Sequence, residues 1–258
     1  MRAYARLALA GFRRYSTYRQ AMVAGMATNV AFGLLRMAIL VAAVTQGPIA
    51  GYDLAATATY VWLGQGLMAV VVLWGDKALA DRIRNGDVVV DLYRPWHLQL
   101  AMFAEDLGRA AYALLVRFAP PVAFGALFFP FRWPSPTTSL TFAVSVVLAV
   151  AVSFGLRFLL NATTFWLLDN RGVNAMYTTV TWLLCGLTVP LAFFPEWATP
   201  VLWSLPFASM LQAPVEVFLE HGSPWPFLAG QASWAVVLLA AGHFVLNRAV
   251  RKVVVQGG

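Results

Sequence analysis

Charged residues are scarce in this chain: they make up 11% of its 258 residues, whereas hydrophobic residues make up 60%. A water-soluble domain of this length carries roughly 25% charged residues. The deficit means that most of the surface faces something other than water, which excludes an ordinary soluble domain. The 18 basic residues outnumber the 11 acidic ones. In a chain with long apolar runs this excess indicates orientation in a membrane, so nucleic acid is not expected as a partner.

Sequence motifs for catalysis and metal binding are also missing. Cys185 is the only cysteine, which excludes an intrachain disulfide. The chain has no Gly-x-x-x-x-Gly-Lys-[Ser/Thr] loop and therefore no P-loop of its own. Neither His-Glu-x-x-His nor Cys-x-x-Cys occurs, so we expect no metal site and no cofactor bound by this chain. No internal repeat is evident, although secondary transporters built from inverted repeats often show one.

Long apolar runs are what the sequence has instead. A helix needs about 20 mainly apolar residues to cross about 30 Å of hydrocarbon. Six stretches meet this need, at about 21–45, 54–75, 101–129, 140–168, 173–194 and 227–247. We therefore predict an all-α, polytopic membrane protein with six transmembrane helices in a single transmembrane domain, residues 1–258. Pro120–Pro121 predicts a kink in the third helix.

Basic residues outside these stretches collect on one side. The termini and the even-numbered loops hold Arg2, Arg6, Arg13, Arg14, Arg19, Lys77, Arg82, Arg84, Arg94, Arg171, Arg248, Arg251 and Lys252. The odd-numbered loops hold only Arg132. Because cytoplasmic loops carry the excess of Lys and Arg, both termini are expected in the cytoplasm.

The N-terminal segment, residues 1–20, is amphipathic when drawn as a helix. One face carries Arg2, Arg6 and Arg13, and the opposite face carries Tyr4, Leu7, Gly11, Tyr15 and Tyr18. This pattern is typical of a helix that lies in the membrane interface. Such a helix serves as a topology anchor or, alternatively, also contacts a cytoplasmic partner.

Two loops are longer than a simple connection requires. The second, residues 76–100, alternates charges around Leu79 and Ile83 and has a helix stop at Asn85–Gly86. It is either a docking surface or an ordinary solvated helix. The fifth, residues 195–226, is broken by prolines and holds no Lys or Arg. Because exposed irregular backbone is not tolerated in lipid, we expect short helices at the outer surface or re-entering from it, as a gate or as a lid that only packs.

Three arginines, Arg36, Arg117 and Arg157, lie well inside the predicted spans, where charges are expensive and usually face the bundle interior. No acidic residue is expected at their depth, so backbone carbonyls, lipid phosphates or an anionic substrate group are the candidate partners. Snorkelling to the interface is the alternative. Glu105 and Arg109, spaced i, i+4, are expected to pair with each other.

An enzyme is the least favoured class. Ser153 and His243 lie at similar depth in two predicted spans, as in an intramembrane serine protease. However, Ser153 lacks the Gly-x-Ser-Gly turn that such enzymes use, and no oxyanion donor is evident.

Several local motifs carry a family resemblance. They are Ile83-Arg84-Asn85-Gly86-Asp87, Leu92-Tyr93-Arg94-Pro95, Trp166-Leu167-Leu168-Asp169, Gly186, Pro190-Leu191, Phe194-Pro195, Leu205-Pro206-Phe207 and Pro214. The whole chain resembles ABC-2 type permeases, in particular a branch of bacterial multidrug and antibiotic exporters that pair with a separate ATPase. A stand-alone secondary transporter or channel is the alternative.

The resemblance implies a location in the bacterial inner membrane, as well as partners and site residues. The partners are ABC ATPase subunits that bind ATP and Mg, a second identical or paralogous permease, and membrane lipids. The implied ATPase-coupling residues in 76–100 are Leu79, Asp81, Arg82, Ile83, Arg84, Gly86, Asp87 and Arg94. The candidates for the translocation path are Arg36, Arg117 and Arg157. The candidates for an external gate are Pro195, Pro206, Phe207 and Glu216.

Overall fold

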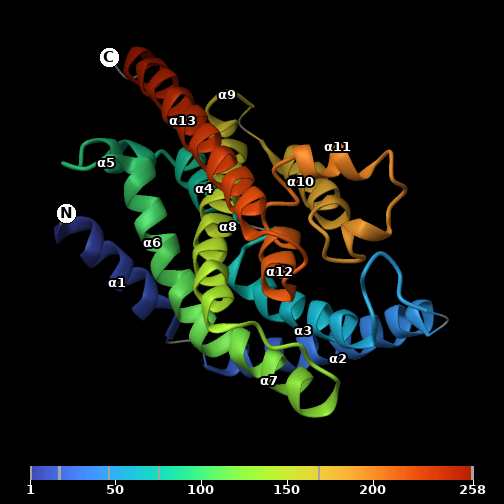
Figure 1. Cartoon of the computed structure of the whole chain (residues 1–258). Helices are drawn as coiled ribbons and strands as arrows, with labels where there is room; N and C mark the ends of the chain where they lie inside the picture. Colours follow the sequence, from blue (N-terminus) through green and yellow to red (C-terminus); the bar gives the residue numbers. More distant parts are fainter. Residues whose placement is uncertain (1, 17–18, 46, 75, 168, 257–258) are drawn as a thin grey trace.

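The computed structural model describes residues 2–16, 19–45, 47–74, 76–167 and 169–256 (Figure 1). In chain order its elements are α1 (Arg2–Ser16), α2 (Arg19–Val44), α3 (Leu54–Val70), α4 (Ala78–Arg84), α5 (Val88–Leu92), α6 (Leu98–Ala113), the π-helix η1 (Leu114–Phe118), α7 (Ala119–Phe128), α8 (Pro136–Ala162), α9 (Thr164–Leu167), α10 (Arg171–Leu184), the 3-10 helix η2 (Leu191–Phe193), α11 (Thr199–Ser204), α12 (Gln212–Leu219) and α13 (Pro224–Gln256). These ranges contain no β-strand beyond one isolated bridge between Ile49 and Tyr52. The predicted all-α class is therefore confirmed for this part of the chain. The predicted segments also included Met1, Thr17, Tyr18, Gly75 and Leu168, which lie outside the described residues.

Four stretches of the described chain are long and apolar enough to cross a membrane. They are Gly25–Val44, Leu98–Phe128, Pro136–Leu167 and Pro224–Arg251. They match the first, third, fourth and sixth predicted spans. The protein is a multi-pass membrane protein.

The other two predicted spans are shorter than expected, so six full-length spans are not confirmed. The helix α3 has 17 residues, or about 26 Å at 1.5 Å per residue. The helix α10 has 14 residues, or about 21 Å, against about 30 Å of hydrocarbon. It ends where Gly186 takes a φ of 76°, a left-handed conformation that does not continue a helix.

The third predicted span continues through the prolines as α6, η1 and α7 in succession, and the kink expected there stays a prediction. Pro120 and Pro121 have no backbone N–H, so the carbonyls of Val116 and Arg117 lose their helical donors. The five residues of η1 form a π-helical turn just before this point. Turns of this kind inside α-helices are frequent at functional sites.

The helix α3 forms the centre of the core. Its side chains from Ala56 to Leu67 are all buried, including Trp62 and Gln65. Around it lie α2, α7 and α12. The long helices α8 and α13 pack against each other, and Figure 1 shows both running through the middle of the molecule.

The first helix is packed on the bundle along α6. Gly11 of α1 lies against the backbone of Glu105, and Gly108 of α6 lies against the backbone of Ala8. A side chain at either glycine would collide with these atoms, so the two helices depend on glycine for their close approach. Arg2 and Arg6 on the other face are exposed. The interfacial position of α1 stays a prediction.

The predicted short helices before the last span are present as η2, α11 and α12. They do not all lie on a surface, because every residue of α12 is buried. This helix packs against α8, α13 and α3. Of the two arrangements expected for the fifth loop, the packing of α12 matches a segment that re-enters the bundle.

Candidate functional site

The C-terminal end of α3 lies inside the bundle, where its last carbonyl groups have no helical N–H to bind. Arg109 of α6 donates to two of them, with Nη1 3.1 Å from the oxygen of Ala69 and Nη2 2.8 Å from the oxygen of Val70. The Ser153 hydroxyl of α8 donates to the oxygen of Val72 over 2.6 Å. These bonds allow α3 to end within the protein, and the chain continues from Val71 in extended form.

Arg157 of α8 lies between two carboxylates. Its Nη1 is 2.7 Å from Oδ2 of Asp76, and its Nη2 is 2.7 Å from Oδ2 of Asp106. Oδ1 of Asp106 accepts from Nε of Arg109 over 2.6 Å. Arg157, Asp106 and Arg109 are all buried. We call Asp76, Asp106, Arg109 and Arg157 the four-charge cluster; it carries no net charge, as burial of ions requires.

Asn161, one helical turn after Arg157, connects the cluster to α4. Its Nδ2 donates to the backbone oxygens of Asp76, at 2.9 Å, and Arg157, at 2.7 Å. Its Oδ1 accepts from the backbone N–H of Ala80 at 3.2 Å. That N–H belongs to the first turn of α4, whose own N-cap residue, Lys77, makes no side-chain cap bond. Asn161 thus satisfies one N–H of this turn from α8, and Oδ1 of Asp76 accepts from another, that of Ala78, at 3.0 Å.

The arrangement is suited to transmitting a movement of α4 to α6 and α8. Hydrogen bonds and ion pairs join the end of α3 and the start of α4 to α6 and α8, so a displacement of α4 moves carboxylates and amides that these helices hold. Within the described residues, no group of three or more His, Cys, Asp or Glu side chains is placed to hold a metal ion.

The family model described as ABC-2 family transporter protein matches residues 30–257, which include the whole four-charge cluster. The chain belongs to the ABC-2 transporter family. The comparison with curated proteins returned no match. The resemblance drawn from the sequence motifs is therefore confirmed at the level of the family.

In this ABC-2 transporter, the expectation that no acid lies at the depth of the intramembrane arginines is wrong for Arg157. Because α3 ends early, Asp76 enters the bundle beside α8, and Asp106 reaches the same guanidinium from α6. An anionic substrate group is not needed to balance the charge of Arg157.

Arg36 and Arg117 have different surroundings. With the Gln65 amide oriented to satisfy its neighbours, its oxygen accepts from Nη1 of Arg36 at 3.1 Å. Arg117 lies in η1 and forms no ion pair with any carboxylate of the described residues, and its Nε is buried without a hydrogen-bond partner there.

One further expectation about a pair is wrong, and the disfavoured protease pair does not form. Arg109 pairs with Asp106, three residues earlier, and not with Glu105, because its guanidinium turns toward the end of α3. Ser153 and His243 do not form a catalytic pair, since the serine hydroxyl is committed to Val72.

His243 instead contacts His97 and Asn247. Its Nδ1 lies 2.8 Å from Nε2 of His97, and its Nε2 lies 2.9 Å from Nδ2 of Asn247. Burial lowers the pKa of His97, and the neighbouring His243 lowers it further. This arrangement leaves His243 without the serine that a protease would require.

The second loop of the transporter forms α4 and α5, separated by the predicted stop at Gly86, which has a φ of 81°. Leu79 is 1% exposed and packs with Phe154 and Phe158 of α8, and Ile83 is partly buried against the same cluster. Leu79 is therefore unavailable as an anchor for a partner, because its face of α4 is used to attach the loop to the bundle.

Other side chains of this loop remain at the surface. Val90 is 62% exposed and Tyr93 is 86% exposed. Local ion pairs surround them: Arg82 with Asp91, Arg84 with Asp81 and, at 3.8 Å, Arg94 with Asp91. Asp87 is exposed at the start of α5. The exposed apolar surface is thus on α5 and the residue after it, which the sequence pattern did not single out.

The four candidates for an external gate are not brought together as one group. Glu216 of α12 is buried, and its Oε1 accepts from the Tyr52 hydroxyl over 2.7 Å. Its Oε2 is 2.8 Å from Nδ1 of His221. Burial, and next the charge of Glu216, raise the pKa of Tyr52 well above its usual value, so the hydroxyl keeps its proton and donates it.

The remaining gate candidates lie in the segment before α12. Pro206 is buried, Phe207 is half-buried and Pro195 is exposed. Phe207 lies near Tyr177 of α10, with 6.4 Å between the ring centroids. The segment is thus connected to α10 by an aromatic contact, whereas α12 is connected to the Tyr52 loop through Glu216.

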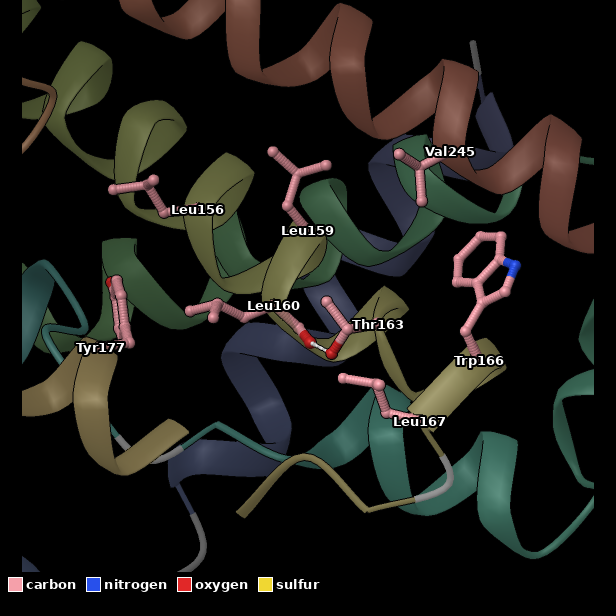
Figure 2. A pocket seen from close by; sticks show the side chains of 8 residues that line it. All are labelled: Leu156, Leu159, Leu160, Thr163, Trp166, Leu167, Tyr177 and Val245. Carbon is pink, nitrogen blue, oxygen red and sulfur yellow. Dashed lines mark hydrogen bonds between the residues drawn. The ribbon is translucent and has the colours of Figure 1, made fainter. Parts of the chain in front are cut away.

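An apolar groove of about 520 Å³ lies between α8, α9, α10 and α13 (Figure 2). Its lining residues are Leu156, Leu159, Leu160, Thr163, Trp166, Leu167, Tyr177 and Val245. The Thr163 hydroxyl donates to the backbone oxygen of Leu160, at 2.6 Å. Its proton is therefore not directed into the groove.

Proposed function

We propose that this chain is the permease subunit of an ATP-driven exporter, in which it forms the translocation path while separate ATPase subunits bind ATP and Mg and hydrolyse the ATP. The observation that carries the proposal is the connection of α4 to α6 and α8 through Asp76, Arg157 and Asn161. A force applied to the 76–100 segment by an ATPase reaches two spans through these bonds. The family match supports this assignment.

The coupling surface in this proposal is the exposed side of 76–100. Val90 and Tyr93 are its apolar centre, and Asp81, Arg84, Asp87 and Arg94 are its charged rim. Leu79 and Ile83 attach the segment to the bundle, Arg82 holds Asp91, and Gly86 provides the turn. ATP-driven closure of the partner biases the membrane subunit between two conformations.

A second permease subunit, identical or paralogous, completes the path. One face of α10 supports this, because Met176, Trp182 and Leu183 are exposed on it. Membrane lipid covers the other exposed apolar side chains. Arg36 and Arg117 remain candidates for the path, whereas Arg157 belongs to the four-charge cluster. Pro195, Pro206, Phe207 and Glu216 are the candidate gate on the opposite side.

The orientation in the bacterial inner membrane follows from the basic residues, with both termini and 76–100 in the cytoplasm. In a Cys185→Ala background, Arg14→Cys is expected to resist a membrane-impermeant thiol reagent added to intact cells, and Glu196→Cys is expected to react. Both residues are exposed, so access depends on the side of the membrane. Labelling of Arg14→Cys with protection of Glu196→Cys would reverse the orientation.

The function is tested by purifying the tagged full-length chain from its native membranes. We expect an ATPase subunit with a P-loop to co-purify, and ATP hydrolysis and vesicle transport to require both proteins. The matched control is the chain separated from that subunit, which should hydrolyse no ATP. Transport by the chain alone, without ATP, would assign it to the secondary transporters or channels instead.

A further inference from the structure

A cavity of about 240 Å³ lies between α1, α2, α3 and the α6–η1 helix. Its lining residues are Tyr15, Asn29, Met68, Ala69, Val72, Leu73, Trp74, Arg109 and Arg117. Its volume is below the roughly 300–1,000 Å³ typical of pockets for drug-sized ligands. The space suits a small polar group better than a whole drug-sized molecule.

The lining contains two arginines and no acidic residue. Arg109 is neutralised by Asp106 and is held by the oxygens of Ala69 and Val70. Arg117 has no such partner. All 11 acidic residues of the sequence belong to the described part of the chain, and none forms an ion pair with Arg117. The cavity therefore holds one guanidinium whose charge no side-chain carboxylate of this protein balances.

The position of the cavity indicates what supplies the missing anion. Gly25 lies near the N-terminal end of α2, which begins at Arg19, and a Cβ built on it would lie 3.2 Å from Nη2 of Arg117. The guanidinium thus lies beside the N-terminal part of this membrane-spanning helix. Tyr15 and Trp74, at the same cavity, are 45% and 38% exposed. Tyrosine and tryptophan are enriched at the depth of lipid head groups.

We propose that this cavity binds a phosphate group, with Arg117 as the charged ligand and Arg109 and Asn29 beside it. The planar guanidinium matches the oxygens of a phosphate in two parallel hydrogen bonds. At this depth the source is the head group of a membrane phospholipid, and a free phosphate ion has the same chemistry. The inference does not depend on ATP-driven transport.

The test uses the full-length chain in neutral detergent, with binding measured by native mass spectrometry and by the shift in melting temperature. The probes are a short-chain phosphatidylglycerol, a diacylglycerol with the same acyl chains and no phosphate, and inorganic phosphate. We expect phosphatidylglycerol to bind and diacylglycerol not to bind. Binding of inorganic phosphate with the same affinity as the lipid would support the phosphate site and assign it to the free ion.

The variants isolate the arginine. Arg117→Met is expected to weaken phosphatidylglycerol binding by about tenfold or more, since hydrogen bonds to charged groups are worth about 1.5–3 kcal/mol. Arg117→Lys keeps the charge but loses the paired donors of the guanidinium, so its affinity for phosphatidylglycerol should lie between those of the parent and Arg117→Met. It replaces the methionine variant in the test if that variant does not fold. The matched control is Arg36→Met, another intramembrane arginine without a carboxylate partner, which does not line this cavity. Equal binding by the parent and both Arg117 variants, or binding of diacylglycerol as tight as that of phosphatidylglycerol, would overturn the proposal.

Discussion

Replacing Arg157 with methionine is expected to lower the free energy of unfolding by about 3–5 kcal/mol, the usual cost of removing one partner from a buried ion pair. Methionine fills much of the same volume, so the loss is electrostatic more than steric. Asp106 keeps Arg109, but Asp76 loses its only ion-pair partner within the described chain. Because the side chain of Asp76 is 34% exposed and partly hydrated, we expect the lower end of this range. The measurement is a denaturant titration of the purified chain in detergent.

The chain provides a matched control for burial. Arg132 and Asp53 form an ion pair at 2.6 Å, close to the 2.7 Å of the Arg157 pairs, but their side chains are 41% and 44% exposed. Exposed pairs typically contribute about 0–1 kcal/mol, so Arg132→Met should have a small effect. The backbone N–H of Ala56, followed by Arg132, lowers the pKa of Asp53, which thus keeps a donor in the variant.

A compensating substitution separates charge from packing. Adding Asp76→Asn to Arg157→Met removes one negative and one positive charge and leaves the Asp106–Arg109 pair intact. We expect the double variant to recover more than half of the lost stability. Two results would contradict this prediction: an equal loss in the free energy of unfolding for Arg157→Met and Arg132→Met, or no recovery in the double variant. Either would show that the four-charge cluster does not stabilise the protein through its charges.

The sequence predicted the long helices well because they depend on local properties. Twenty apolar residues in a row indicate a span wherever the rest of the chain lies, as α8 and α13 illustrate. The stop between α4 and α5 was also local, since Gly86 adopts the left-handed conformation that glycine permits. Hydropathy could not show that α3 ends at Val70. That end depends on Arg109, which is 39 residues away in the sequence.

In the candidate site too, local features could be predicted, whereas features that depend on residues distant in the sequence could not. Arg157 was recognised because a charge inside a span is unusual, and that signal alone requires a partner. Its partners Asp76 and Asp106 were assigned to the cytoplasmic side, since depth was counted along straight, full-length helices. Asn161 was missed altogether, because a polar residue near a helix end gives no sign that it caps another helix. In α4, the alternating charges were read correctly as one face, but periodicity does not say which face meets the bundle.

The largest functional effect is expected from Tyr93 and Val90, the exposed apolar residues of the 76–100 segment. Tyr93→Ala removes an aromatic side chain that is 86% exposed and that makes no hydrogen bond within the described chain. Central aromatic anchors of interfaces contribute about 2 kcal/mol or more, so capture of the ATPase should weaken by more than about tenfold. Val90→Asp should abolish capture, because docking would bury an unpaired carboxylate. Neither change touches the core, so both variants should reach the membrane in normal amounts.

Substitutions at Leu79 and Ile83 should behave differently. Both side chains pack in the cluster that holds Phe154 and Phe158 of α8, so Leu79→Ala should destabilise the chain itself by about 2–5 kcal/mol, with a smaller effect for the partly buried Ile83. Reduced abundance in the membrane should then accompany any loss of ATPase capture. Arg94→Ala, at the rim, should change capture little, since rim contacts contribute little individually.

The coupling prediction is decided by comparing abundance with capture. The control is Trp197→Ala, an exposed aromatic residue just before α11, a helix that Figure 1 shows apart from α5. The measurement is a pull-down of the ATPase by each variant after extraction, with ATP hydrolysis recorded beside it. Tyr93→Ala and Val90→Asp should be abundant and uncoupled, Leu79→Ala scarce, and Trp197→Ala equal to the parent. Normal capture by Val90→Asp would show that α5 is not part of the docking surface, because no packed interface accepts an unpaired carboxylate at its centre without loss of affinity. The connection of α4 to α6 and α8 would then be structural alone.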